Sequence, residues 1–179
     1  MRIRIIAGKY GSRVIKAPSG HVTHPMSERI RGALFNSVGT AIKDAEVLDA
    51  FAGSGALGLE AISRGAASVT FVERDRSALQ VLAENIDLLD CAEVAKVINS
   101  GVASWSDKTT ERFDLIFADP PYNDMQLSTV TRLFGLLKPN GLMVLSYPGR
   151  SEVPTETGVV VVDNRSYGTA ALTFYRLDR

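Results

Sequence analysis

The pattern of apolar and polar positions predicts strands that alternate with helices along most of the 179-residue chain. Short runs of Val, Ile, Leu and Phe are typical of buried strands, whereas apolar residues three and four positions apart indicate helices. We therefore expect strands at residues 47–51, 69–72, 94–98, 113–118, 142–146, 159–162 and 170–175. We expect helices from Glu28 (with Ser27 as N-cap), from a Gly-rich turn to about Arg64, at 77–89 and at 127–137.

The order of these elements predicts an α/β fold with a doubly wound, mostly parallel sheet. The connection between 159–162 and 170–175 is too short for a crossover helix, so these last two strands must be antiparallel to each other. Residues 2–5 and 12–17 flank the turn-like segment Gly8-Lys9-Tyr10-Gly11 and predict a β-hairpin. We therefore divide the chain into a basic N-terminal hairpin with its connector, residues 1–26, and a main domain, residues 27–179.

Composition bounds the class of protein. At 45% hydrophobic and 22% charged residues, the chain resembles ordinary globular domains. No apolar run approaches the roughly 20 residues that span a bilayer, and the first residues lack the pattern of a signal peptide. The single cysteine, Cys91, forms no internal disulfide, and His21 and His24 have no Cys or clustered acids nearby, so we expect no metal site. These observations predict a soluble, cytoplasmic protein.

The formal net charge of zero conceals an uneven distribution. Residues 1–31 carry seven basic side chains and one acidic side chain, a net charge of plus six, which the acidic remainder of the chain cancels. Such asymmetry indicates contact with nucleic acid, although a solvated hairpin that lacks acids explains it equally well. The candidate RNA-binding residues of the hairpin are Arg2, Arg4, Lys9, Arg13 and Lys16.

A glycine-rich turn follows the first strand of the main domain. The segment Gly53-Ser54-Gly55-Ala56-Leu57-Gly58 matches G-x-G-x-x-G, and Glu73 ends the next strand. This arrangement is typical of a nucleotide-type cofactor site, in which the acid accepts hydrogen bonds from ribose, but such turns also occur for packing alone. Asp49 favours S-adenosylmethionine, because a carboxylate there offsets a cationic amino group and is poorly placed beside a pyrophosphate. The alternative is an Asp49 that only caps the amides of the turn.

A second motif, Asp119-Pro120-Pro121-Tyr122, follows the buried strand 113–118. At this edge open α/β sheets bind their ligands. The Asp119 carboxylate and the Pro120 carbonyl can accept both N–H bonds of an exocyclic amine, which frees its lone pair for attack on a methyl group, and Tyr122 offers a ring on which a base stacks. Asp-Pro-Pro is also common in plain turns. Its position after a buried strand favours catalysis over that alternative.

These motifs resemble those of methyltransferases that use S-adenosylmethionine and modify amino groups. Three further segments narrow the resemblance to the RsmD family: Arg4 to Tyr10 (RIIAGKY), Glu28 to Asn36 (ERIRGALFN) and Arg165 to Gly168 (RSYG). The resemblance covers essentially the whole chain and implies a Rossmann-like class I methyltransferase domain. It also implies transfer of a methyl group from S-adenosylmethionine to the exocyclic N2 of a guanine in 16S ribosomal RNA.

The resemblance implies a role for each matched position. Asp49, Phe51, Gly53 and Gly55 would line the cofactor pocket, Glu73 would bind the ribose hydroxyls, and Ser100, Gly101 and Val102 would flank the adenine. Asp119, Pro120 and Tyr122 would hold the guanine amine, and the hairpin would dock on RNA. The implied partner is small-subunit ribosomal RNA in an assembled or partly assembled subunit, and the protein would act as a monomer.

The chain departs from the family pattern in two places. His24-Pro25-Met26 stands where the family usually has Arg-Pro-Thr, and Asn99-Ser100 stands where many related enzymes have an acid that binds the adenine amine. The first departure removes a guanidinium and a hydroxyl near the expected mouth of the pocket. The second makes readout of the adenine by a side chain doubtful.

Other functions share parts of this pattern. A DNA adenine-N6 methyltransferase would carry the same Asp-Pro-Pro-Tyr motif, but 179 residues leave little room for a separate target-recognition domain. Protein glutamine methyltransferases usually have Asn at the position of Asp119. An NAD(P)-binding oxidoreductase would explain the glycine turn and Glu73, yet it leaves Asp119 to Tyr122 unexplained.

Overall fold

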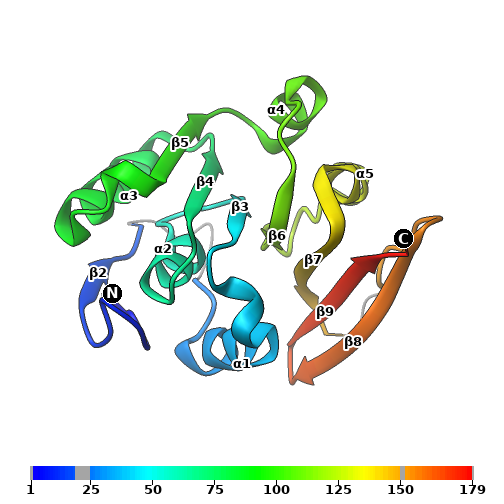
Figure 1. Ribbon diagram of the computed structural model, residues 1–179, viewed down its shortest axis with the longest axis horizontal. Helices are drawn as coiled ribbons and strands as arrows, with labels where there is room; N and C mark the ends of the chain where they lie inside the picture. Colours follow the sequence, from blue (N-terminus) through cyan, green and yellow to red (C-terminus); the bar gives the residue numbers. More distant parts are fainter. Residues whose placement is uncertain (1, 19–24, 150–151, 179) are drawn as a thin grey trace.

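The computed structural model describes residues 2–18, 25–149 and 152–178. Its centre is a seven-stranded sheet with the order β5-β4-β3-β6-β7-β9-β8 (Figure 1). The strands are β3 (Glu46–Ala50), β4 (Ser68–Glu73), β5 (Ala95–Asn99), β6 (Phe113–Ala118), β7 (Leu137–Pro148), β8 (Val159–Tyr167) and β9 (Ala170–Leu177). The helices are α1 (Glu28–Val38), α2 (Ala56–Ser63), α3 (Arg76–Leu89), α4 (Val102–Lys108) and α5 (Leu127–Leu133). Short 3₁₀ turns are η1 (Gly39–Ile42), η2 (Ala92–Val94) and η3 (Phe134–Leu136).

Strand directions confirm the predicted doubly wound α/β class. Strands β5, β4, β3, β6 and β7 are parallel, and β9 lies antiparallel between β7 and β8. The predicted antiparallel pairing of the last two strands is therefore confirmed. Ser27 caps α1 as predicted, because its Oγ accepts a hydrogen bond from Ile30 N at 3.2 Å.

One predicted boundary is wrong, and one helix was not predicted. The predicted helix over 127–137 ends at Leu133, continues as one 3₁₀ turn and becomes strand at Leu137. Gly135 stands within this stretch and disfavours a continued α-helix. The sequence analysis also missed α4, whose Gly101 N-cap provides no side-chain hydrogen bond and so leaves no capping signal in the sequence.

Helices cover both faces of the sheet. Successive residues of the strands point to opposite faces of the sheet. Those on one face pack with α1, α2 and α3, and those on the other face pack with α4 and α5, which gives two apolar clusters. Val47, Phe71 and Phe117 belong to the first cluster, whereas Leu48 and Ile116 belong to the second. The fold is a three-layered α/β/α arrangement, in which α4 and α5 lie together on one side (Figure 1).

The predicted N-terminal hairpin is present as β1 (Arg2–Arg4) and β2 (Val14–Lys16), which pair antiparallel. Its apolar side chains lie in the same cluster as those of α1–α3: Ile3, Ile5, Tyr10 and Ile15. Hairpin and main domain thus share one core, and the division at residue 26 stays a prediction. His21 and His24 lie outside the described residues.

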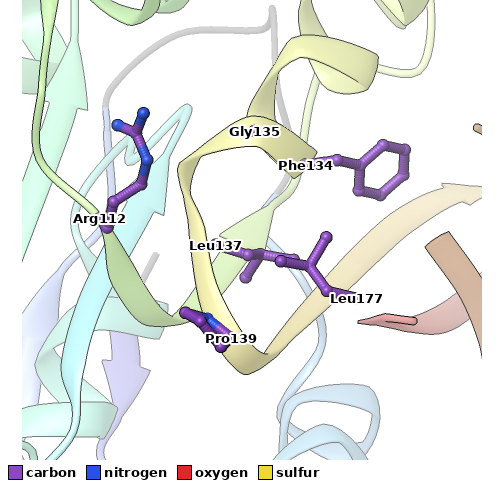
Figure 2. Close-up of a pocket in the computed structure, with 6 residues that line it drawn as sticks. All are labelled: Arg112, Phe134, Gly135, Leu137, Pro139 and Leu177. Atoms are coloured by element: carbon purple, nitrogen blue, oxygen red, sulfur yellow. The ribbon is translucent and has the colours of Figure 1, made fainter. Parts of the chain in front are cut away.

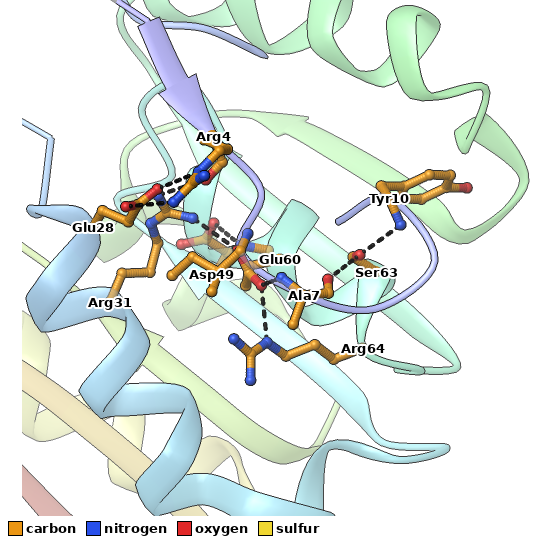
Figure 3. Close-up of polar contacts among 11 residues, drawn as sticks. Arg4, Ala7, Tyr10, Glu28, Arg31, Asp49, Glu60, Ser63 and Arg64 are labelled. Atoms are coloured by element: carbon orange, nitrogen blue, oxygen red, sulfur yellow. Dashed lines mark hydrogen bonds and ion pairs between the residues drawn. The ribbon is translucent and has the colours of Figure 1, made fainter. Parts of the chain in front are cut away.

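A buried charge network fastens the hairpin to α2 (Figure 3). The Glu60 carboxylate, which is fully buried, accepts hydrogen bonds from the backbone N–H groups of Ile6 and Ala7 and from Arg31 and Arg64, at 2.8–3.1 Å. Ser63, one turn later, accepts a bond from Tyr10 N at 2.9 Å. Burial lowers the pKa of Arg31, although Glu60 opposes this. Within the described ranges, no helix is both long and apolar enough to cross a membrane.

Candidate active site

The carboxyl ends of three strands, β3, β4 and β6, bring polar side chains to one edge of the sheet. Asp49 in β3 pairs with Phe71 in β4 and with Phe117 in β6, so Glu73 and Asp119 lie one alternation beyond these phenylalanines on the same face. Strand β3 lies between β4 and β6, and the chain winds in opposite directions from it. This is the switch point at which doubly wound sheets bind ligands.

The glycine-rich turn between β3 and α2 adopts a backbone that suits close approach of a ligand. Phe51, Gly53 and Gly55 all have positive φ angles, of 58°, 58° and 87°. A Cβ at Gly55 would collide with Leu82, whereas a Cβ at Gly53 would meet no atom within 4 Å. Gly55 thus serves packing against α3, and Gly53 faces open space, where a ligand can approach the main chain.

Glu73 holds this turn in place. Its Oε1 accepts a hydrogen bond from Gly53 N at 2.8 Å, and its Oε2 accepts bonds from Arg74 N and Asp75 N, both at 2.8 Å. Ser100 lies beside it, because Ser100 N donates to the Glu73 carbonyl at 3.1 Å. Gly101 and Val102 follow at the start of α4, where Val102 is buried. The predicted ribose and adenine residues are therefore neighbours.

Asp49 is buried beneath the turn. Its Oδ2 accepts a hydrogen bond from Gly58 N at 2.9 Å, so the carboxylate does cap an amide of α2. Burial raises the pKa of Asp49 well above its usual range, the Gly58 amide lowers it, and the Asp119 and Glu73 carboxylates raise it further. Carboxylates that repel one another in this way are stabilised by a cation bound among them.

The Asp119-Pro120-Pro121-Tyr122 segment leaves β6 beside these acids. Burial raises the pKa of Asp119 to about 6, an effect that hydrogen bonding to Ser146 partly offsets. Pro120 is buried, whereas Tyr122 is 43% exposed. The Tyr122 hydroxyl lies 2.7 Å from Ser146 Oγ, and burial raises the pKa of Tyr122 as well.

Ser146 is a residue of the site that the sequence analysis missed. Ala118 pairs with Leu145 in β7, so the next residue on each strand, Asp119 and Ser146, lie side by side. A serine at the end of the predicted strand 142–146, next to a strand that ends in Asp119, was the available signal. Ser146 is therefore a polar partner of both Asp119 and Tyr122.

Residues 3–176 match the model of a family described as Conserved hypothetical protein 95. The chain belongs to this family. It is the RsmD family of ribosomal RNA methyltransferases that the sequence motifs resemble, and its methyl donor is S-adenosylmethionine, so the predicted family and cofactor are confirmed.

Several members are similar over most of their length. Ribosomal RNA small subunit methyltransferase D of Escherichia coli (strain K12) is 39% identical over 140 residues, which cover 78% of this chain and 69% of that protein. The Haemophilus influenzae protein of the same name is 31% identical over 180 residues, 97% of this chain and 93% of that one. A solved structure of yhhF from Escherichia coli superposes with a TM-score of 0.89 at 32% identity and covers 100% of this chain and 99% of that one.

The residues of this RsmD-family protein fit the donor of the family. Open space next to Gly53 admits a ligand to the turn. The buried Asp49 carboxylate, whose pKa its burial and the nearby acids raise, suits a molecule that brings an ammonium group beside it. Both observations come from the chain itself, and both fit S-adenosylmethionine.

The five basic hairpin residues do not gather at this edge of the sheet. Arg4 binds Glu28 at 2.8 Å, Lys16 binds Glu84 at 2.8 Å, and Arg13 donates to the Leu88 carbonyl at 2.7 Å. Arg2 and Lys9 are exposed and form no ion pair within the described part of the chain. Their contact with RNA stays a prediction.

A shallow hollow of about 300 Å³ lies elsewhere in the fold (Figure 2). It is lined by Arg112, Phe134, Gly135, Leu137, Pro139 and Leu177. Arg112 precedes β6 and Leu137 begins β7, so the hollow lies at the amino ends of these strands, opposite the site. None of the predicted site residues lines it, and the chemistry of the RsmD family gives it no role.

Proposed function

We propose that this protein transfers a methyl group from S-adenosylmethionine to the exocyclic N2 of a guanine in small-subunit ribosomal RNA. One observation supports the proposal: Asp119, directly after β6, lies on the same face and edge of the sheet as Asp49 and Glu73, and Pro120 and Tyr122 follow it. Acceptors for an exocyclic amine thus stand next to a turn suited to the donor. The names of relatives such as the Escherichia coli enzyme support ribosomal RNA of the small subunit as the substrate.

The motif residues position the amine. The Asp119 carboxylate and the Pro120 carbonyl accept its two N–H groups, which leaves the nitrogen lone pair directed at the methyl group. Bound S-adenosylmethionine supplies an electrophilic methyl group on a sulfonium. As the N–C bond forms, the bond between the methyl carbon and the sulfur breaks and a neutral thioether would leave; the amine loses one proton, which the ionised Asp119 carboxylate would accept. The exposed ring of Tyr122 stacks on the base, and Ser146 fixes its hydroxyl.

Each group of cofactor residues binds a different part of S-adenosylmethionine. Asp49 offsets the positive charge of its amino acid part, and Gly53 and Gly55 with Phe51 form the main-chain turn against which it lies. The Glu73 carboxylate accepts hydrogen bonds from three backbone amides and has lone pairs left. These lone pairs accept hydrogen bonds from the ribose hydroxyls. The main chain at Ser100, Gly101 and Val102 borders the adenine.

A labelling experiment tests the proposal. The protein is incubated with S-adenosylmethionine carrying a labelled methyl group and with unmodified small subunits, free small-subunit RNA or DNA, and each product is digested to nucleosides. We expect label in N2-methylguanosine from the subunits or the RNA. Label only in N6-methyladenine from DNA would overturn the proposal in favour of a DNA methyltransferase.

Two controls separate chemistry from binding. Asp119→Ala should abolish turnover and leave binding of S-adenosylhomocysteine largely intact, because Asp119 contacts the amine rather than the donor. Isothermal titration with NAD(P) and with S-adenosylmethionine tests the oxidoreductase alternative, since only the latter should bind.

A further inference from the structure

Two segments without a role in the proposed chemistry meet at the edge of the sheet that holds the site. They are the first turn of α1, from the ERIRGALFN motif, and the end of β8, from the RSYG motif. The guanidinium carbon of Arg29 lies 5.9 Å from the centroid of the Tyr167 ring, which is within range of a cation–π contact.

The strand register places this pair relative to Asp119. Pro148, two residues beyond Ser146, pairs with Ala170, and Ala170 pairs with Tyr167. Tyr167 therefore lies at the same edge of the sheet as the site, and it packs on the same face, against the cluster formed with α1–α3. Three strand spacings of about 4.8 Å separate β6 from β8, or about 14 Å. An RNA segment that presents a base to Asp119 can cover this distance.

Tyr167 is partly buried and packs against the core, and the guanidinium of Arg29 lies close to its ring. Arg29 is exposed and forms no ion pair among the described residues. Arg29 is thus an accessible planar cation next to an aromatic ring. Unpaired RNA bases stack on such guanidinium planes and on aromatic rings.

The pair also adjoins the hairpin. Arg4 in β1 binds Glu28 at the start of α1, and the adjacent Arg29 contacts Tyr167 in β8. Hairpin, α1 and the end of β8 consequently form one connected side of the molecule (Figure 1).

We propose that Arg29, supported by Tyr167, is a stacking site for an unpaired base of the ribosomal RNA that flanks the target guanine. This inference rests on the proposed function. Arg29 contacts the RNA, whereas Tyr167 is a positioning residue that acts through Arg29.

Steady-state methylation of unmodified small subunits tests the site with five variants: Arg29→Ala, Arg29→Lys, Tyr167→Ala, Tyr167→Phe and the control Arg112→Ala. Arg112 is an exposed arginine at the opposite edge of the sheet (Figure 2). Affinity for S-adenosylhomocysteine and the thermal midpoint are measured for each variant, to detect damage to the cofactor site or the fold.

We expect Arg29→Ala to raise KM for the subunit about 10-fold, as loss of one stacked base does, with unchanged cofactor affinity. Arg29→Lys keeps the charge but not the plane, so it should raise KM nearly as much. Tyr167→Ala should raise KM by a smaller factor, and Tyr167→Phe and Arg112→Ala should behave like the wild type.

Three results would overturn the inference: a normal KM for Arg29→Lys, a change in Arg29→Ala no larger than in Arg112→Ala, or a parallel loss of cofactor affinity. These results leave the proposed function intact if the wild type forms N2-methylguanosine. A wild type that methylates no guanine of the subunit would instead refute the proposed function, and the stacking site with it.

Discussion

Replacement of Glu60 by Gln tests whether the buried network holds the N-terminal hairpin to the fold. All four partners of the Glu60 carboxylate are donors: Ile6 N and Arg31 Nη1 on Oε1, and Ala7 N and Arg64 Nε on Oε2. An amide group at this position must turn its own N–H₂ toward one of these donor pairs. Two hydrogen bonds are then lost in either orientation.

The cost follows from the burial of Arg31. Its side chain is 2% exposed and Glu60 is its only ion-pair partner in the described part of the chain, so Glu60→Gln leaves a buried cation without a counter-charge. Breaking a buried pair in this way costs about 3–5 kcal/mol. This is a large fraction of the ~5–15 kcal/mol that stabilises a typical domain.

Urea denaturation followed by the fluorescence of Trp105 measures this loss. The matched control is Glu84→Gln, which removes the exposed ion pair of Lys16 and should have little effect. Hydrogen exchange should also become faster at the amides of Ile6 and Ala7. If Glu60→Gln loses no more stability than Glu84→Gln, or if both amides remain protected, our account of the network is wrong.

Three further results are expected at the site and the hairpin. Because a protonated Asp119 can no longer accept the proton that the amine loses, kcat/KM should fall as the pH drops through about 6, and a pH profile of Asp119→Asn should lack that limb. Ser146→Ala removes a bond to Tyr122 and the group that lowers the pKa of Asp119, so kcat/KM should fall about 5-fold and the acid limb should move to higher pH; an unmoved limb would contradict the contact. Lys9→Glu should weaken RNA binding and flatten its dependence on salt, and an equal salt slope in filter binding would exclude Lys9 from the RNA surface.

The residues at the carboxyl edge of the sheet could be predicted because short sequence patterns mark them. A two-residue alternation fixes which strand residues share a face, and a glycine turn and an Asp-Pro-Pro segment mark where two strands end. Glu73 and Asp119 therefore lie where the sequence indicates. Ser146 ends the predicted strand 142–146, but its partnership with Tyr122 follows from the register of β6 and β7, which the sequence does not show.

The charge of the hairpin region could not be interpreted from sequence alone. Arg31 counts toward the plus six of residues 1–31, yet it is buried against Glu60. Arg4 and Lys16 likewise bind acids that lie 24 and 68 residues away along the chain. A sum of charges does not detect such partners, so the positive charge free to meet RNA is smaller than the sum, and Arg2, Lys9 and Arg29 carry much of it.

The anchoring of the hairpin on α2 limits how independently this part of the protein can be exchanged. A Cβ at Gly8 would collide with the carbonyl of Ser63. The backbone amides of Ile6 and Ala7 donate two of the hydrogen bonds that the buried Glu60 carboxylate accepts. A hairpin transferred from a relative must therefore have glycine at this position and the same main-chain conformation. For the same reason, removal of residues 1–17 would expose the core and the buried charges of α2. Such a truncation would measure the effect on folding, whereas point substitutions of exposed hairpin residues measure the effect on RNA binding.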